Sequence, residues 1–208
     1  MKKVLLSAVA VMAFMSVSAQ ETRFGVKAGA NLSTFTGDAD GVKSLVGFQV
    51  GGFAEIKLTD KFAIQPEVLF STQGGKYKES ALGYSQEDKL NLSYLNVPVM
   101  AKYYVAEKFS VEAGPQIGFL LSAKDKYEYS GPDGSDSGKE DIKDGFKSID
   151  FGVNFGAGYD FTENLSLGLR YTLGLSSVAD TPDEFEDFGF GDITVRNSNL
   201  ALALAYKF

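Results

Sequence analysis

The sequence predicts an all-β protein that folds as an eight-stranded antiparallel up-and-down transmembrane β-barrel. Three observations support this fold class. Apolar and polar residues alternate with a period of two in eight separate segments, which is the period of β-strands. The connections between these segments are short and long in turn, as in bacterial outer-membrane barrels. Residues 200–208 place Leu, Leu, Leu, Tyr and Phe on one face of a final strand, and only a closed barrel leaves no open edge at such a strand.

The amino end has the three parts of a secretory signal peptide. Two lysines precede an apolar run at residues 4–15, and Val-Ser-Ala at 17–19 supplies small residues at the expected cleavage site. The apolar run is too short to span a bilayer as a helix. We therefore expect a signal peptide at residues 1–19 and a single outer-membrane β-barrel domain at residues 20–208.

Composition argues against several functional classes. The chain has 27 acidic and 20 basic residues, a formal net charge of −7, so we expect no nucleic-acid partner, because phosphates require clustered basic side chains. It has no Cys, hence no disulfide and no cysteine for a lipid anchor. It also has no His, the commonest general base and transition-metal ligand. We therefore expect no catalytic residues, no metal site and no cofactor.

The alternating segments and their connections define the expected strands in order. The segments are residues 22–35, 44–58, 62–76, 89–104, 108–124, 147–160, 165–177 and 193–208. Short turns at 59–61, 106–107 and 162–164 alternate with long acidic surface loops at 36–43, 77–88, 125–146 and 178–192. An even number of strands places both chain ends on the short-turn side of the barrel.

Residue parity assigns the two faces of each strand. One face is apolar, with residues such as Phe48, Phe155 and Leu204, and the other is polar and rich in Gly. A soluble lipocalin-like barrel would turn the apolar face inward, whereas an outer-membrane barrel turns it toward lipid. Aromatic residues gather at the short-turn ends of the apolar face and predict a belt at one membrane interface. This aromatic belt consists of Phe24, Phe62, Tyr103, Phe109, Tyr159, Phe161, Tyr206 and Phe208.

The chain resembles the PorT-like outer-membrane β-barrel family of Bacteroidota. The resemblance lies in residues 24–33 (FGVKAGANLS), in residues 94–99 (YLNVPV) with Lys102 and Tyr103, and in the terminal Tyr-Lys-Phe. It covers essentially the whole chain after the signal peptide. It implies an eight-stranded barrel that the outer-membrane assembly machinery inserts after reading the carboxyl-terminal strand, and it implies little about activity.

Charged residues on the polar face predict a charge network inside the barrel. This network consists of Lys27, Glu55, Glu67, Lys102, Glu112, Asp150 and Arg170. Such charges must be paired in a narrow interior, because an unpaired buried charge costs several kcal/mol. An eight-stranded barrel is about filled by its own side chains. We interpret the network as a packed polar core, and the alternative is a narrow pore gated by exchange of ion-pair partners.

Two of the long loops carry further candidate features. Oxygen-bearing side chains at positions 133, 135, 137, 141 and 144 have spacings similar to a calcium loop, but Asp144 replaces the bidentate Glu and no helices flank the segment. We interpret it as a solvated acidic loop without a metal. Residues 180–192 combine six acids with Phe185, Phe188 and Phe190, which are candidates for contact with another loop, lipid or a partner.

These observations favour an integral protein of the bacterial outer membrane with a non-enzymatic structural or surface-interaction role. The alternatives are a small-solute porin-like channel and a soluble lipocalin-like ligand-binding barrel. The expected partners are outer-membrane lipid, the barrel assembly machinery and an unidentified extracellular or periplasmic protein.

Overall fold

The computed structural model describes residues 21–208 except 40, 82–83, 133 and 181–193. The elements in these residues are strands β1 (Thr22–Gly37), β2 (Lys43–Lys57), β3 (Phe62–Ala81), β4 (Tyr84–Ala106), β5 (Phe109–Gly131), β6 (Gly134–Asp141), β7 (Ile149–Asp160), β8 (Leu165–Gly174) and β9 (Val195–Lys207), and the 3-10 turn η1 (Lys143–Gly145). Across the described ranges, no helix is long and apolar enough to cross a membrane.

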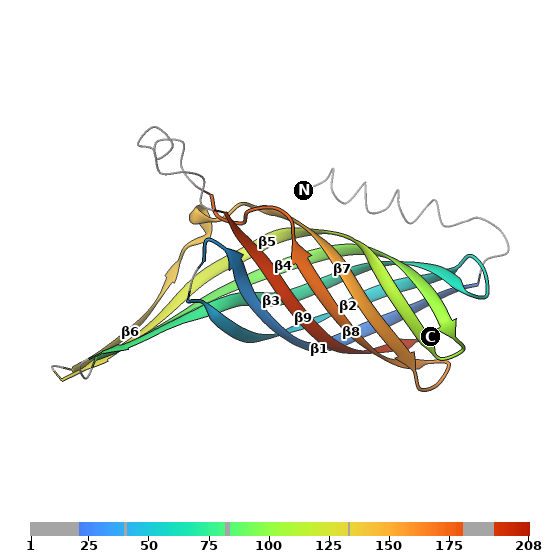
Figure 1. Ribbon diagram of the computed structural model, residues 1–208, viewed down its shortest axis with the longest axis horizontal. Coiled ribbons are helices and arrows are strands. Elements are labelled where there is room, and N and C mark those ends of the chain that lie inside the picture. The colour runs from blue at the N-terminus through green and yellow to red at the C-terminus, as the bar shows by residue number, and fades with distance from the viewer. Residues whose placement is uncertain (1–20, 40, 82–83, 133, 181–193) are drawn as a thin grey trace.

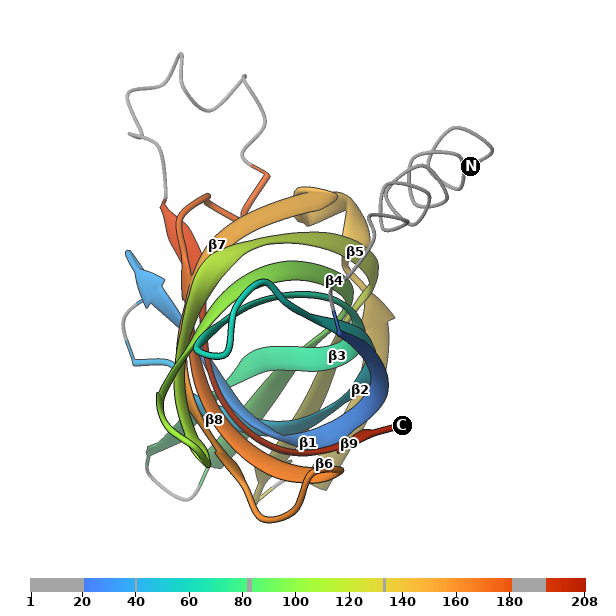
Figure 2. The same cartoon turned by 90° about the vertical axis from the view of Figure 1, so that its right-hand side faces the viewer.

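Eight of the strands close into a ring. Each pairs with its neighbours in the order β1-β2-β3-β4-β5-β7-β8-β9, every pair is antiparallel, and β9 returns to pair with β1. Figure 2 looks into this ring from the end where the chain terminates. The predicted eight-stranded antiparallel up-and-down barrel is confirmed. Strand β6 stands outside the ring and, among the described strands, pairs with β5 alone.

Two of the expected loops are wrong. Residues 77–88 and most of 125–146 continue the barrel strands as two long hairpins, β3–β4 and β5–β6, which project beyond the rim on the left of Figure 1. Strands β4 and β5 each have 23 residues, whereas a tilted membrane strand needs about 9–11. The extensions carry polar residues on both faces, so they have no apolar period, yet the antiparallel ladder still pairs their backbone groups. The fourth long loop, 178–192, lies largely outside the described residues.

The faces of the barrel are turned apolar outward and polar inward. Phe48, Phe155 and Leu204 are 51%, 53% and 52% exposed, whereas Lys102 and Arg170 are only 6% and 7% exposed. A soluble barrel of the lipocalin type has the opposite arrangement. The structure therefore contradicts the lipocalin-like alternative, because an outward surface of this kind is suited to hydrocarbon.

An apolar cluster, which the sequence analysis missed, fills the lumen near the hairpin end of the ring. Its buried members are Phe35, Leu92, Tyr94, Leu120, Ala123 and Val178. A register shift contributes to it: Ser93 pairs with Ser122 but Tyr94 pairs with Leu120, so Leu121 is an extra residue in β5. This bulge reverses the parity of β5. Leu120 and Ala123 therefore both face inward, while Leu121 faces outward and is exposed.

Candidate functional site

A cluster of four charged side chains crosses the middle of the lumen. This central ion cluster consists of Lys27 on β1, Glu67 on β3, Glu112 on β5 and Arg170 on β8. Glu67 accepts hydrogen bonds from Lys27 Nζ at 2.8 Å and from Arg170 Nη1 and Nη2 at 2.9 and 2.8 Å. Arg170 also donates from Nε and Nη2 to Glu112 Oε1 at 2.8 and 2.6 Å. Two cations and two anions from four strands thus neutralise one another.

Local sequence explains why these side chains can meet. All four residues have the inward parity of their strands, and the barrel is narrow enough for side chains from opposite walls to touch. Gly156 on β7 provides the space, since a Cβ atom there would lie 3.0 Å from Glu112 Oε1 and 2.8 Å from the Leu169 carbonyl oxygen. Gln65 completes the environment of Glu67 by donating from Nε2 to Oε1 at 2.7 Å. The cluster is a cross-brace between walls of the barrel.

A second cluster lies nearer the short-turn end. This lower ion cluster consists of Glu55, Lys102, Asp160 and Lys207. Lys102 Nζ is 2.7 Å from Glu55 Oε2, and Lys207 Nζ is 3.4 Å from both Glu55 Oε1 and Asp160 Oδ2. Tyr104 also donates its hydroxyl to Glu55 Oε1 at 2.9 Å. The sequence analysis did not include Asp160, Lys207 or Tyr104, although the parity of residue 207 already placed it on the polar face.

Asp150 lies apart from both clusters. It accepts hydrogen bonds from Asn197 Nδ2 at 2.7 Å and from Ser176 Oγ at 2.8 Å, and Asn197 also donates to the Tyr94 hydroxyl at 3.3 Å. No described cation lies within ion-pair distance of Asp150. The structure therefore does not bring together Glu112 and Asp150, which belong to different polar groups of the lumen.

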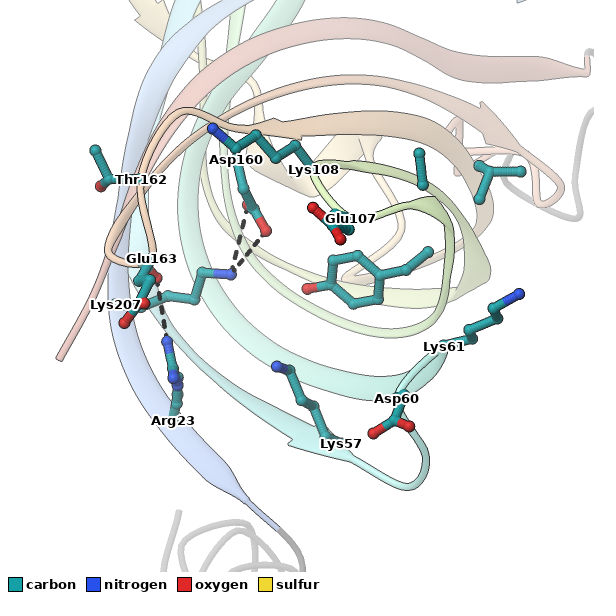
Figure 3. A pocket seen from close by; sticks show the side chains of 13 residues that line it. Arg23, Lys57, Asp60, Lys61, Glu107, Lys108, Asp160, Thr162, Glu163 and Lys207 are labelled. Carbon is teal, nitrogen blue, oxygen red and sulfur yellow. Dashed lines mark hydrogen bonds and ion pairs between the residues drawn. The ribbon is translucent and has the colours of Figure 1, made fainter.

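A wide cavity of about 930 Å³ opens at the short-turn end (Figure 3). Charged side chains of both signs line it, including Arg23, Lys57, Asp160, Glu163 and Lys207. Arg23 donates from Nη1 to the Glu163 carbonyl oxygen at 3.3 Å. Beyond the lower ion cluster the free volume falls to about 30 Å³, which is room for a water or two. The central ion cluster and then the apolar cluster follow, so two barriers stand in series between this cavity and the hairpin end.

The aromatic side chains predicted to form a belt surround the short-turn end. Seven of them are exposed, Phe24, Tyr103, Phe109, Tyr159, Phe161, Tyr206 and Phe208, and Phe62 is half-buried. They are brought together by strand pairing, since Phe62 is opposite Tyr103 and Phe109 is opposite Tyr159. Two pairs also make edge-to-face ring contacts, Tyr159 with Phe161 and Tyr206 with Phe208, at centroid distances of 5.4 and 5.7 Å.

The projecting hairpins form a continuous four-stranded sheet, which we call the hairpin sheet. It comprises residues 76–81 of β3, 84–91 of β4, 124–131 of β5 and all of β6. Its inner face continues the lumen lining and has tyrosines and acids, with the rings of Tyr84 and Tyr129 stacked at 6.2 Å. On this face, burial raises the pKa of the Asp125 carboxyl, and the negative charge of Asp88 adds to the effect.

The segment with calcium-loop spacing is mostly a strand in this sheet. Of the predicted oxygen ligands, Ser135, Ser137 and Asp141 lie on one face of β6, and Ser135 and Asp141 are about 20 Å apart along the extended strand. Ligands spread along an extended strand do not converge on one ion, and the described residues contain no group of three acids placed to hold a metal. The expectation of a loop is wrong here. Phe185, Phe188 and Phe190, the candidates for loop contacts, lie outside the described residues.

Several solved structures resemble the chain at low sequence identity. No curated protein sequence is significantly similar to the chain. Among solved structures, Ail, the attachment invasion locus protein of Yersinia pestis, is 16% identical with a TM-score of 0.48, over 90% of this chain and 99% of that chain. Neisserial surface protein A is 16% identical with a TM-score of 0.49, over 89% and 97%. OprG from Pseudomonas aeruginosa is 13% identical with a TM-score of 0.41, over 91% and 97%.

The family is established by sequence rather than by these structures. Residues 18–180 match the model of a family described as the outer membrane protein beta-barrel domain. This match includes most of the ring and both hairpins. The chain therefore belongs to the outer membrane protein beta-barrel domain family and is an integral protein of the bacterial outer membrane.

Proposed function

We propose that the chain is a non-enzymatic outer-membrane protein whose closed barrel anchors and displays the hairpin sheet. The observation that carries this proposal is the double closure of the lumen by the central ion cluster and the apolar cluster. Arg170 and Glu67 brace the middle from opposite walls, and Tyr94 is 1% exposed in the apolar cluster. A lumen closed in this way suits a rigid support better than a passage or a reaction chamber.

Electrical recording tests this function. Purified protein in planar bilayers is expected to give no steady conductance, because both barriers are built from packed side chains. Large and regular openings of the wild-type protein would contradict the proposal. A heat-denatured sample is the control for leaks that do not depend on the folded barrel.

A small-solute channel is the second candidate, and the 930 Å³ cavity at the short-turn end favours it. If the central ion cluster acts as a gate, Arg170→Ala or Glu112→Ala removes a partner and should change the conductance. Lys139→Ala, at an exposed position on β6 outside the ring, is the matched control. Conductance that is absent from wild type and from both lumen variants excludes the channel.

We propose that the termini and short turns face the periplasm and that the hairpin sheet faces outward, with residues 1–19 removed as a signal peptide. The support is the usual arrangement of such barrels, in which the periplasmic turns are the short ones. A protease site inserted at the β5–β6 tip, between Gly131 and Gly134, should be cut on intact cells. The same site inserted in the turn at residues 162–164 should be cut only after the cells are broken.

The PorT-like assignment and the expected partners belong to the same proposal. The YLNVPV motif supports the assignment, since Tyr94, Asn96 and Pro98 line the lumen while the alternate residues face outward. Exposed aromatic rings around the short-turn end support a belt at the membrane interface. The terminal strand, which ends in Phe208, supports recognition by the barrel assembly machinery. An unidentified extracellular or periplasmic protein is the remaining proposed partner.

A further inference from the structure

Five lysines lie directly opposite one another across five neighbouring strands. Lys43 on β2 pairs with Lys76 on β3, Lys76 with Lys89 on β4, Lys89 with Lys126 on β5, and Lys126 with Lys139 on β6. Residues in such positions share one face of the sheet, with Cβ atoms about 5 Å apart. We call these five residues the lysine row. It crosses the base of the hairpin sheet over roughly 20 Å.

The lysine row lies on the outward face, in continuation of the lipid-exposed surface. The β3–β4 register is regular through this region, so Lys76 has the parity of outward Phe70, and Lys89 has that of Leu95. On the opposite face, Leu92, three residues along β4 from Lys89, is fully buried. The row begins three to six residues beyond the last outward apolar side chains of β2, β3 and β4, which is about 10–20 Å along the strands. Because the strands are tilted, the lysines lie less than this distance above the hydrocarbon.

Most of this positive charge has no partner within the described residues. Lys89 pairs with Glu87 at 2.9 Å and with Glu128 at 3.6 Å, while the other four lysines of the row make no ion pair with a described residue. Like charges directly opposite one another in a sheet are destabilising. The chain as a whole is acidic, so composition does not explain a row of five lysines. A bound anion that bridges the lysines would explain it.

The two faces of the hairpin sheet differ in charge. The residues with the parity opposite to the lysine row lie on the inner face. This face has no basic residue at the described positions, and its acids are Glu79, Asp88, Asp125, Asp136 and Glu140. The outer face also has Lys78 and Lys124 on either side of the row, and it has three acids, Glu87, Glu128 and Asp141, so basic residues outnumber acidic ones there. Positive charge is therefore concentrated on the side that continues the surface facing lipid.

We propose that the lysine row binds the phosphate groups of lipid headgroups in the leaflet around the hairpin end of the barrel. Lysine is a strong phosphate binder as a point charge, and its long aliphatic stem lets the ammonium group reach toward the interface. The lipid is favoured over a soluble anion because the row adjoins the lipid-exposed surface on the same face. A headgroup with two phosphates contacts several lysines at once, since neighbouring ammonium groups are spaced like neighbouring strands. This inference uses the membrane location and does not depend on the closed lumen or the orientation.

The test compares lipid binding by purified full-length barrels in neutral detergent. The probe is lipid A with two phosphates, in mixed micelles, against the same lipid without phosphate. Wild type is expected to bind the phosphorylated form selectively and less tightly at high salt. The double variant Lys76→Gln, Lys126→Gln should bind it on the order of tenfold more weakly, because each surface lysine contributes to attraction by anionic lipid. The control double variant Lys61→Gln, Lys108→Gln, in the short turns, should bind as wild type does.

Three outcomes would overturn the proposal. These are equal binding of phosphorylated lipid A by wild type and the Lys76/Lys126 variant, equal binding of the two lipids by wild type, and binding of inorganic pyrophosphate at the row as tight as that of lipid A. Misfolding is separated from loss of the site by measuring stability without lipid. Without lipid, the Lys76/Lys126 variant should be at least as stable as wild type, because it lacks two of the like charges in the row. The variant Lys76→Arg, Lys126→Arg keeps the charge and should retain binding.

Discussion

Arg170 on β8 binds Glu67 on β3 across the lumen through two parallel hydrogen bonds, from Nη1 to Oε2 at 2.9 Å and from Nη2 to Oε1 at 2.8 Å. Glu67→Ala leaves Arg170 and Lys27 with an excess of buried positive charge. We expect the free energy of unfolding to fall by about 3–5 kcal/mol, measured by urea titration in lipid vesicles. Glu107→Ala, in an exposed short turn, should change it by less than about 0.5 kcal/mol. Similar effects of the two substitutions would refute the role of the cluster as a brace.

The outward face of β9 offers a test of lipid contact. Leu202 is 51% exposed in the middle of the apolar band, opposite Leu169. Leu202→Arg should lower the free energy of unfolding by about 2–4 kcal/mol, the range for a basic residue at mid-bilayer. Ser137→Arg on β6 places the same charge outside the band and should be nearly neutral. An unchanged stability for Leu202→Arg would mean that this surface does not contact hydrocarbon.

The terminal residue offers a test of assembly. Phe208 contacts the Tyr206 ring edge-to-face and donates its backbone N–H to the Phe24 carbonyl oxygen at 2.8 Å. Phe208→Asp removes an interfacial aromatic and adds a charge, so less folded barrel should reach the outer membrane. The measurement is the amount of heat-modifiable protein in membrane fractions. Phe208→Tyr should preserve assembly, and normal amounts of the Asp variant would argue against a signal at this end.

Asp125 predicts how the stability of the β5–β6 hairpin depends on pH. Burial raises the pKa of its carboxyl, its Oδ1 has no hydrogen-bond partner, and it lies opposite Glu140. The folded hairpin therefore holds a proton more tightly than the unfolded chain, and stability increases as the pH falls through the raised pKa. Hydrogen exchange of the hairpin amides, corrected for intrinsic rates, measures this. Asp125→Asn should weaken the dependence, whereas Asp136→Asn at an exposed position should leave it unchanged.

The strand pattern of the ring was predictable because each barrel strand has one face in hydrocarbon. That constraint produces a period of two that is visible in any single segment, as in residues 200–208. It also set the inward parity of residues such as Lys27 and Arg170. That these charges would pair inside the barrel was predictable. Which cation meets which anion was not, because it depends on the stagger between strands that are distant in sequence.

The hairpin sheet and the apolar cluster could not be predicted for two different reasons. Residues 85–89 are polar on both faces of the strand, so they lack the alternation that marks a half-buried strand. The apolar cluster depends on the bulge at Leu121, which reverses the parity of β5 and has no signal in the local sequence. The lysine row likewise became visible only when the register of five strands was known.

Strand β6 has a consequence for how barrels meet one another. Within the described residues it is bonded along one side, so the peptide groups of its other side can accept an incoming extended chain. If two such strands from neighbouring molecules paired, Asp136, Lys139 and Glu140 of one copy would lie against those of the other, which disfavours the pairing. The two glycines of β6 also weaken such a strand pair. Replacing these charged residues by Val or Thr would remove their protection against edge-to-edge pairing, and the barrels would be expected to link into ribbons in detergent.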